Sequence, residues 1–182
     1  MRKLFIVTAL SLFMIGTSFA QGIQFKSVTA RAGLILPNSP WETGFLIGAE
    51  ADLGINVNNI AIMPVLSYWH TSYSYNFLGS YDLSLSNLQI GADAHYSLED
   101  ATNVKGLYAG GGLSLNFESF DFPNYSYSGT SSTTDTNIGF SLLTGYNLAL
   151  GSMDGVAQAR YNLISGLNTF ELTFGIMFDM AK

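Results

Sequence analysis

Residues 168–180 alternate between apolar and polar side chains over their whole length. The apolar positions are Phe170, Leu172, Phe174, Ile176, Phe178 and Met180, and the positions between them include Glu171, Thr173 and Asp179. A period of two predicts a β-strand, because successive side chains leave opposite faces of the pleat. The free N–H and C=O groups on both edges of such a strand need neighbouring strands. The pattern therefore favours a closed ring of strands over an open sheet.

Seven further segments alternate in the same way, so the 182 residues contain eight predicted strands. These strands are predicted at residues 24–36, 44–57, 60–73, 81–97, 106–117, 137–150, 155–163 and 168–180. A tilted strand needs about 9–11 residues to cross a bilayer, and every segment meets that length. The connections after the second, fourth and sixth segments are short, whereas the stretch 118–135 is the longest. Short turns on one side and long loops on the other are typical of outer-membrane β-barrels with both termini in the periplasm. The predicted fold is an all-β, eight-stranded, antiparallel, up-and-down transmembrane barrel.

In two of the segments, the sequence does not decide which face of the strand points outward. In residues 60–73 the outward face is either Leu66 and Tyr68 or Val65 and Trp69, and Pro64 allows a bulge because it has no N–H for the sheet. In residues 81–97 the upper part, with Leu85, is out of phase with the lower part. Either a bulge lies between the two parts, or the upper part extends beyond the membrane.

The first 20 residues have the pattern of a secretory signal peptide. Arg2 and Lys3 precede an apolar run at residues 4–15, and Ser18-Phe19-Ala20 fits the small-x-small cleavage rule. We therefore expect a signal peptide at residues 1–20, export through the inner membrane, and a barrel domain at residues 21–182; the alternative is an uncleaved anchor. Removing this peptide takes away two of the seven Lys and Arg residues against 13 Asp and Glu. The acidic mature chain is unsuited to nucleic acid.

The charged residues within the segments lie on the face opposite the apolar face. These residues are Arg31, Glu50, Asp52, Asp93, Arg160 and Glu171. A charge on a lipid-facing strand costs about 2–4 kcal/mol at the bilayer midplane, so the charged face is expected to line the lumen. We predict a lumen charge network in which the arginines lie between the carboxylates; a gated pore is the alternative. A soluble periplasmic ligand-binding barrel would have the opposite polarity, and a periplasmic β-sandwich is a further alternative.

Aromatic residues are expected both at the membrane boundaries and in the external loops. Predicted bands at the two boundaries contain Tyr96, Tyr146 and Phe178 on one side and Phe45, Phe117, Phe140 and Phe170 on the other. The candidate binding residues of the loops are Trp41, Tyr73, Tyr75, Phe77, Tyr125 and Tyr127. Tyrosine among Ser, Gly and Asn forms an adaptable contact surface, which favours adhesion or surface recognition. The alternative is that these aromatic side chains rest on the membrane interface.

The chain resembles the small bacterial outer-membrane β-barrels of the OmpA/OmpX type over residues 21–182. The resemblance rests on the signal peptide, the eight segments and the glycine-rich Gly106-Leu107-Tyr108-Ala109-Gly110-Gly111-Gly112-Leu113. It implies contact with outer-membrane lipid and lipopolysaccharide, and insertion by the barrel assembly machinery, which recognises a terminal aromatic residue. In this chain four residues follow Phe178. We expect a monomer without a cofactor, in a structural, envelope or surface-interaction role.

An enzymatic alternative rests on His70 and Ser72, with Asp82 as a possible third member. This pair resembles the His-x-Ser pair of outer-membrane lipid A deacylases of the PagL type, since a base beside a hydroxyl suits acyl transfer. A two-residue motif in a Ser- and Tyr-rich stretch is weakly specific. Both histidines are isolated from other candidate ligands in the sequence, and no metal-binding spacing is present. We therefore expect neither an enzyme nor a metal site.

Overall fold

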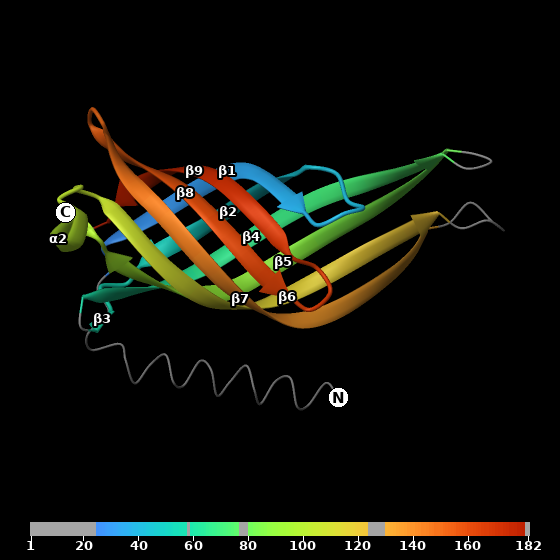
Figure 1. The fold of residues 1–182 in the computed structure, drawn as a ribbon, viewed down its shortest axis with the longest axis horizontal. Coiled ribbons are helices and arrows are strands. Elements are labelled where there is room, and N and C mark those ends of the chain that lie inside the picture. The colour runs from blue at the N-terminus through green and yellow to red at the C-terminus, as the bar shows by residue number, and fades with distance from the viewer. Residues whose placement is uncertain (1–24, 58, 77–79, 124–129, 181–182) are drawn as a thin grey trace.

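The alternating segments form strands that pair in chain order around a ring (Figure 1). The computed structural model describes residues 25–57, 59–76, 80–123 and 130–180. Its elements are β1 (Ser27–Pro37), β2 (Gly44–Asp52), β3 (Asn56–Val57), β4 (Ile60–Asn76), β5 (Ser80–Ser97), α2 (Glu99–Thr102), β6 (Leu107–Pro123), β7 (Thr130–Leu150), β8 (Met153–Ile164) and β9 (Thr169–Asp179). Within the described ranges, no helix is long and apolar enough to span a membrane. The proposed signal peptide lies outside the described residues.

The ring closes because β1 pairs with β2 on one side and with β9 on the other. Arg31 is aligned with Gly48 of β2 and with Gly175 of β9. β2 also pairs with β4, so the two-residue β3 lies outside the continuous circuit of eight long strands. All pairings are antiparallel. The prediction of an eight-stranded antiparallel barrel is confirmed.

The two faces of the wall differ sharply in polarity. On the outside, Leu142 and Ile138 are 66% and 63% exposed. On the inside, Arg160 and Glu171 are 2% and 3% exposed. An apolar exterior around a polar interior suits a barrel surrounded by lipid. It is the reverse of the polarity expected for a soluble ligand-binding barrel.

The prediction of one unbroken strand at residues 44–57 is wrong. β2 ends at Asp52, and β3 begins at Asn56 after a break around Gly54, whose φ of +69° favours glycine. The pairing of β2 with β4 ends at Val65, next to Pro64. The pairing of β4 with β5 runs through Pro64 without a shift in register, so no bulge occurs there.

The structure also shows which face points outward in the two segments whose phase the sequence left undecided. In β4, Leu66 and Tyr68 face outward, whereas Val65 and Trp69 are buried in the barrel. In β5 the register is continuous, and Leu85 is fully buried inside. The upper part of this strand therefore keeps one phase, and its apolar inward-facing side chain belongs to the filling of the lumen.

The stretch predicted as a long loop at residues 118–135 is largely β-structure. β6 continues to Pro123, and β7 begins at Thr130, which is aligned with Pro123. The β4–β5 and β6–β7 hairpins project beyond the other strands at one end of the barrel, which we call the hairpin end (Figure 1). The opposite end carries α2, β3 and the β7–β8 turn, and we call it the turn end (Figure 1). The two ends of the described ring meet there, where the Met180 N–H donates to the Lys26 carbonyl at 2.8 Å.

Candidate functional site

A cluster of apolar side chains fills the lumen below the hairpin end. This apolar plug consists of Ile35, Leu46, Trp69, Leu85 and Leu167, with Trp41 and Phe120 packed against it. Ile35, Trp69 and Leu85 are fully shielded from solvent. This cluster was not predicted from the sequence, because only polar side chains were expected in the lumen. The out-of-phase Leu85 was the feature of the sequence that could have indicated this cluster.

A charge network occupies the lumen between the apolar plug and the turn end. Arg31 donates from Nη1 to Glu50 Oε2 at 3.0 Å. Arg160 donates from both terminal nitrogens to the two carboxylate oxygens of Asp93, and its Nε lies 3.8 Å from Glu171 Oε2. The five residues come from five strands, and each is at least nine-tenths buried. The structure therefore brings five of the six candidate lumen residues together, with each arginine beside a carboxylate.

The sixth candidate, Asp52, lies apart from this network at the turn end. Its Oδ1 accepts the Gly54 backbone N–H at 2.7 Å, so it stabilises the break after β2. Gln158 takes part instead, because its Oε1 accepts from Arg31 at 2.5 Å and from Arg160 at 3.5 Å. Its Nε2 donates to the Tyr108 hydroxyl at 3.2 Å. An uncharged residue on the inward face of β8 thus links the two ion pairs.

Asparagine side chains continue the polar filling. Asn87 Nδ2 donates to Asn116 Oδ1 at 3.0 Å, and Asn162 Nδ2 donates to Glu171 Oε1 at 2.6 Å. A Cβ added at Gly112 would collide with the Asp93 carboxylate and with the Ser141 hydroxyl. Glycine on β6 therefore leaves the space that the Asp93–Arg160 pair occupies. Side chains, and not an open channel, fill this part of the barrel.

The hairpin end contains a cavity of about 370 Å³ that mixes aromatic and acidic side chains. The cavity is lined by Trp41, Phe120, Glu118, Asp135, Thr136, Asn137, Ser165, Gly166 and Leu167. Asn137 Nδ2 donates to Glu118 Oε2 at 3.2 Å. Glu118 Oε1 is buried and has no hydrogen-bond partner among the described residues. This oxygen could accept a hydrogen bond from a ligand in the cavity.

Two of the candidate surface aromatics are described and lie together. The Trp41 ring is 6.5 Å from the Tyr73 ring, edge to face, and 6.1 Å from the Phe120 ring. The side chain of Tyr75 lies outside the described part of the structure. The remaining candidates, Phe77, Tyr125 and Tyr127, also lie outside the described residues. Trp41, Tyr73 and Phe120 therefore form an aromatic cluster at the hairpin end.

The candidate deacylase pair is not joined in the structure. His70 Nδ1 lies 3.1 Å from the Ser86 hydroxyl of β5, and its ring lies 6.0 Å from the ring of Phe45. No hydrogen bond joins His70 to Ser72 in the described ranges, and the side chain of Asp82 is not among the described ones. His70 is thus positioned by a neighbouring strand and by an outward-facing aromatic ring.

A second cavity, of about 290 Å³, opens at the turn end. Its walls include the buried Glu50 and His95 as well as the exposed Asn56, Asn59 and Glu99. His95 stacks on Tyr108, with ring centroids 4.6 Å apart and an interplanar angle of 17°. The charge network can therefore be reached from the turn end, whereas the apolar plug covers it toward the hairpin end.

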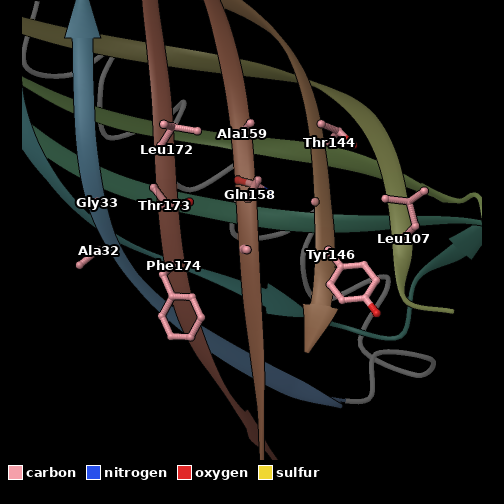
Figure 2. Close-up of a pocket in the computed structure, with 12 residues that line it drawn as sticks. Ala32, Gly33, Leu107, Thr144, Tyr146, Gln158, Ala159, Leu172, Thr173 and Phe174 are labelled. Carbon is pink, nitrogen blue, oxygen red and sulfur yellow. The ribbon is translucent and has the colours of Figure 1, made fainter. Parts of the chain in front are cut away.

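A third hollow lies on the outer wall of the barrel and not in the lumen (Figure 2). It measures about 550 Å³, and its lining includes the small side chains of Ala157 and Ala159 together with Leu172, Phe174 and Tyr146. Most of the side chains around it belong to the apolar outer face, and the inward-facing Gln158 and Thr173 also contribute to its lining. This hollow fits the disordered apolar chains of a surrounding membrane and indicates no specific ligand.

Comparisons with known proteins agree on the fold. No family model matches the chain, and no curated protein matches it by sequence. The crystal structure of Neisserial surface protein A is similar with a TM-score of 0.57 and 20% identity, covering 87% of this chain and 99% of that chain. Ail, the attachment invasion locus protein of Yersinia pestis, is similar with a TM-score of 0.55 and 12% identity, covering 85% of this chain and all of that chain. A structure of Ail with the heparin analogue sucrose octasulfate gives 0.52 and 12%, covering 84% and 97%. The chain therefore has the fold of a small integral outer-membrane β-barrel, as predicted.

Proposed function

We propose that this outer-membrane barrel is a surface-recognition protein whose hairpin end binds a cationic partner. The observation that carries the proposal is the cavity between Trp41, Phe120, Glu118 and Asp135. Aromatic faces and carboxylates together attract ammonium and guanidinium groups, through cation–π contact and charge-assisted hydrogen bonds. Glu118 Oε1, which has no hydrogen-bond partner within the described part of the chain, offers an acceptor for such a donor.

The distribution of charge along the chain supports a cationic partner. The hairpin end carries the carboxylates of Glu42, Glu118, Asp121 and Asp135, on strands or turns that reach this end. The sequence has no lysine or arginine between Arg31 and Lys105 or between Lys105 and Arg160. Because a surface of one sign steers ligands of the opposite sign, basic proteins or peptides are the favoured partners.

The proposed partner is cationic, whereas analogy with the structure of Ail with sucrose octasulfate would suggest an anionic partner. A heparin analogue is a polyanion, and its sulfates need Lys or Arg. The hairpin end of this chain offers carboxylates in their place. The proposed role is thus attachment to a basic surface, and not to a sulfated sugar.

The barrel below this surface serves as a membrane anchor in the proposal. The apolar plug and the charge network support a filled lumen without a conducting path. His70 bonds to Ser86, and not to Ser72, so the proposal contains no acyl-transfer step. It includes a cleaved signal peptide, insertion by the barrel assembly machinery, lipid and lipopolysaccharide around the outer wall, and a monomeric barrel.

Charge removal at the hairpin end tests the proposal. The folded barrel in detergent is expected to bind a lysine-rich peptide with salt-dependent affinity, and to bind heparin less well. The double variant Glu118→Gln/Asp135→Asn should weaken peptide binding by at least about tenfold, since a hydrogen bond to the buried Glu118 carboxylate contributes about 1.5–3 kcal/mol and an exposed pair at Asp135 up to about 1 kcal/mol. The matched control is Glu99→Gln/Asp100→Asn, which makes the same charge change on the exposed α2 at the turn end. Preference for heparin, or equal losses in the two double variants, would contradict the proposal.

A further inference from the structure

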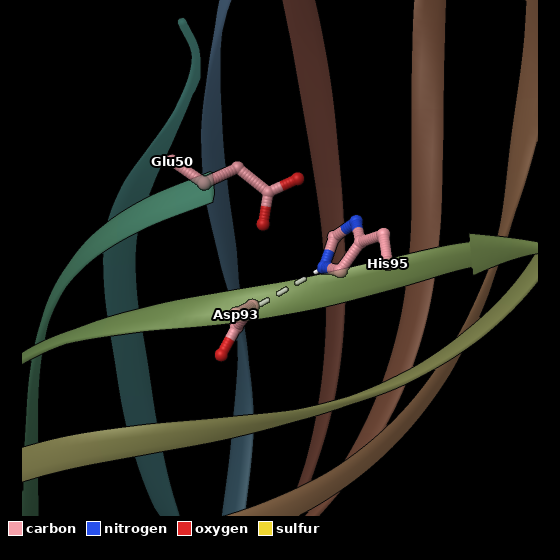
Figure 3. Close-up of side chains that lie close together, drawn as sticks. All are labelled: Glu50, Asp93 and His95. Atoms are coloured by element: carbon pink, nitrogen blue, oxygen red, sulfur yellow. Dashed lines mark ion pairs between the residues drawn. The ribbon is translucent and has the colours of Figure 1, made fainter. Parts of the chain in front are cut away.

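A compact group of potential metal ligands lies where the charge network meets the turn-end cavity (Figure 3). One carboxylate oxygen from each of Glu50 and Asp93 and one ring nitrogen of His95 all lie within 4.8 Å of one another. The three residues come from β2 and β5, which are not neighbouring strands, so their side chains converge across the lumen (Figure 3). All three are buried. We propose that Glu50, Asp93 and His95 bind a divalent transition-metal ion of the zinc class.

The burial of His95 and its unpartnered ring nitrogen, within the described part of the chain, indicate a binding site. The residue is only 7% exposed, yet its Nε2 has no hydrogen-bond partner among the described residues. The nearest carboxylate oxygen, Asp93 Oδ2, lies 3.8 Å from Nε2, which is too long for a hydrogen bond. Two atoms that each bind one ion at about 2.1 Å are at most about 4.2 Å apart, so this spacing suits a shared ion. The Glu50 carboxylate, which Arg31 holds, lies within 4.8 Å of the other two ligand atoms and completes the set.

The charges of the lumen also favour a bound cation. The network holds three carboxylates, on Glu50, Asp93 and Glu171, against the two guanidinium groups of Arg31 and Arg160. One negative charge is therefore not balanced by an arginine in this buried set, and burying an uncompensated charge is costly. A divalent ion beside His95 would offset it. Arg31 and Arg160 orient the carboxylates, and each carboxylate oxygen keeps a second lone pair for the ion.

The surroundings of the site allow an ion to enter and hold the His95 ring in place. The cavity of about 290 Å³ includes Glu50 and His95 among its walls and reaches the exposed residues of the turn end, so a hydrated ion can enter. Tyr108 stacks on the imidazole and is itself held by Gln158. Imidazole nitrogen, carboxylate oxygen and water are all donors that Zn²⁺ accepts, so these three side chains with water can complete its shell.

The two histidines of the chain give a matched pair of variants for the test. Zn²⁺ is titrated into the full-length, tag-free barrel folded in detergent, with calorimetry as the measurement and Co²⁺ absorption as a second one. We expect one ion per chain for the wild type and for His70→Gln, because His70 lies on β4 and bonds to Ser86. We expect at least a tenfold loss of affinity for His95→Gln, since one of three protein ligands is removed.

Folding is verified for each variant by heat-modifiable migration, and Glu50→Gln provides a second route if His95→Gln does not fold. Loss of Zn²⁺ binding in Glu50→Gln, with binding retained in His70→Gln, would support the same site. No Zn²⁺ binding by the folded wild type would overturn the proposal. Equal affinity in the wild type and in the folded variants at His95 and Glu50 would overturn it as well.

Discussion

Replacing Arg160 by methionine is expected to destabilise the barrel by about 3–5 kcal/mol. The guanidinium group is 2% exposed and bonds to both oxygens of Asp93, with Glu171 3.8 Å from its Nε. Methionine fills much of the same volume but leaves two buried carboxylates without this partner. The free energy of unfolding in urea, measured on the detergent-folded protein, gives the loss directly.

Two comparisons isolate the charge effect. Lys105→Met removes a positive charge from an exposed position and should change the free energy of unfolding by no more than about 0.5 kcal/mol. The double variant Asp93→Asn/Arg160→Met should recover part of the loss, because one of the two unpaired carboxylates is removed with the arginine. A stability of Arg160→Met equal to that of Lys105→Met would show that the ion pairs in the lumen are not needed.

Placing an arginine on the outer wall is expected to destabilise the barrel by a comparable amount, because its charge would lie in the lipid and not in the lumen. Leu142 of β7 is 66% exposed and lies between the outward-facing Phe140 and Tyr146. Near the bilayer midplane, Leu142→Arg should cost about 2–4 kcal/mol. The measurement is the free energy of unfolding of the barrel in lipid vesicles.

The same change at the edge of the wall provides the control. Leu150 is the last residue of β7 and is 42% exposed at the turn end. Because polar headgroups and water can solvate the guanidinium group there, Leu150→Arg should cost about 0–1 kcal/mol. Equal costs at Leu142 and Leu150 would contradict a bilayer around this wall.

Most of the fold could be predicted from the alternation of apolar and polar residues with a period of two. Within each strand, charged residues such as Glu50, Arg160 and Glu171 have the opposite parity to the apolar residues, so their inward position could be predicted strand by strand. The break after Asp52 could not, because Ile55 and Val57 continue the alternation even though Gly54 turns the chain. The extension of the β6–β7 hairpin beyond residue 117 was missed because residues 130–136 are Ser, Thr and Asp at successive positions, so no apolar–polar alternation marks a strand there.

The contents of the lumen were harder to predict than its walls. Which arginine meets which carboxylate depends on side chains that reach across the ring, as Arg160 of β8 does toward Asp93 of β5. The convergence of Glu50 with Asp93 and His95 has the same origin, because 43 positions separate Glu50 from Asp93 in the numbering. Spacing in the sequence does not record contacts across a closed barrel. The apolar plug was missed because the phase of Trp69 was left open, and Leu85 was attributed to a bulge or to an extension of the strand beyond the membrane.

The most direct test of the central claim uses single cysteines at positions 170–175 of β9, since the chain has no cysteine of its own. Each folded variant is labelled with a nitroxide in lipid vesicles, and its collision rate with oxygen is measured by electron paramagnetic resonance. Oxygen concentrates in lipid, so we expect high rates at 170, 172 and 174 and low rates at 171, 173 and 175. A reversed alternation, or no alternation, would contradict a barrel with lipid outside and ion pairs inside.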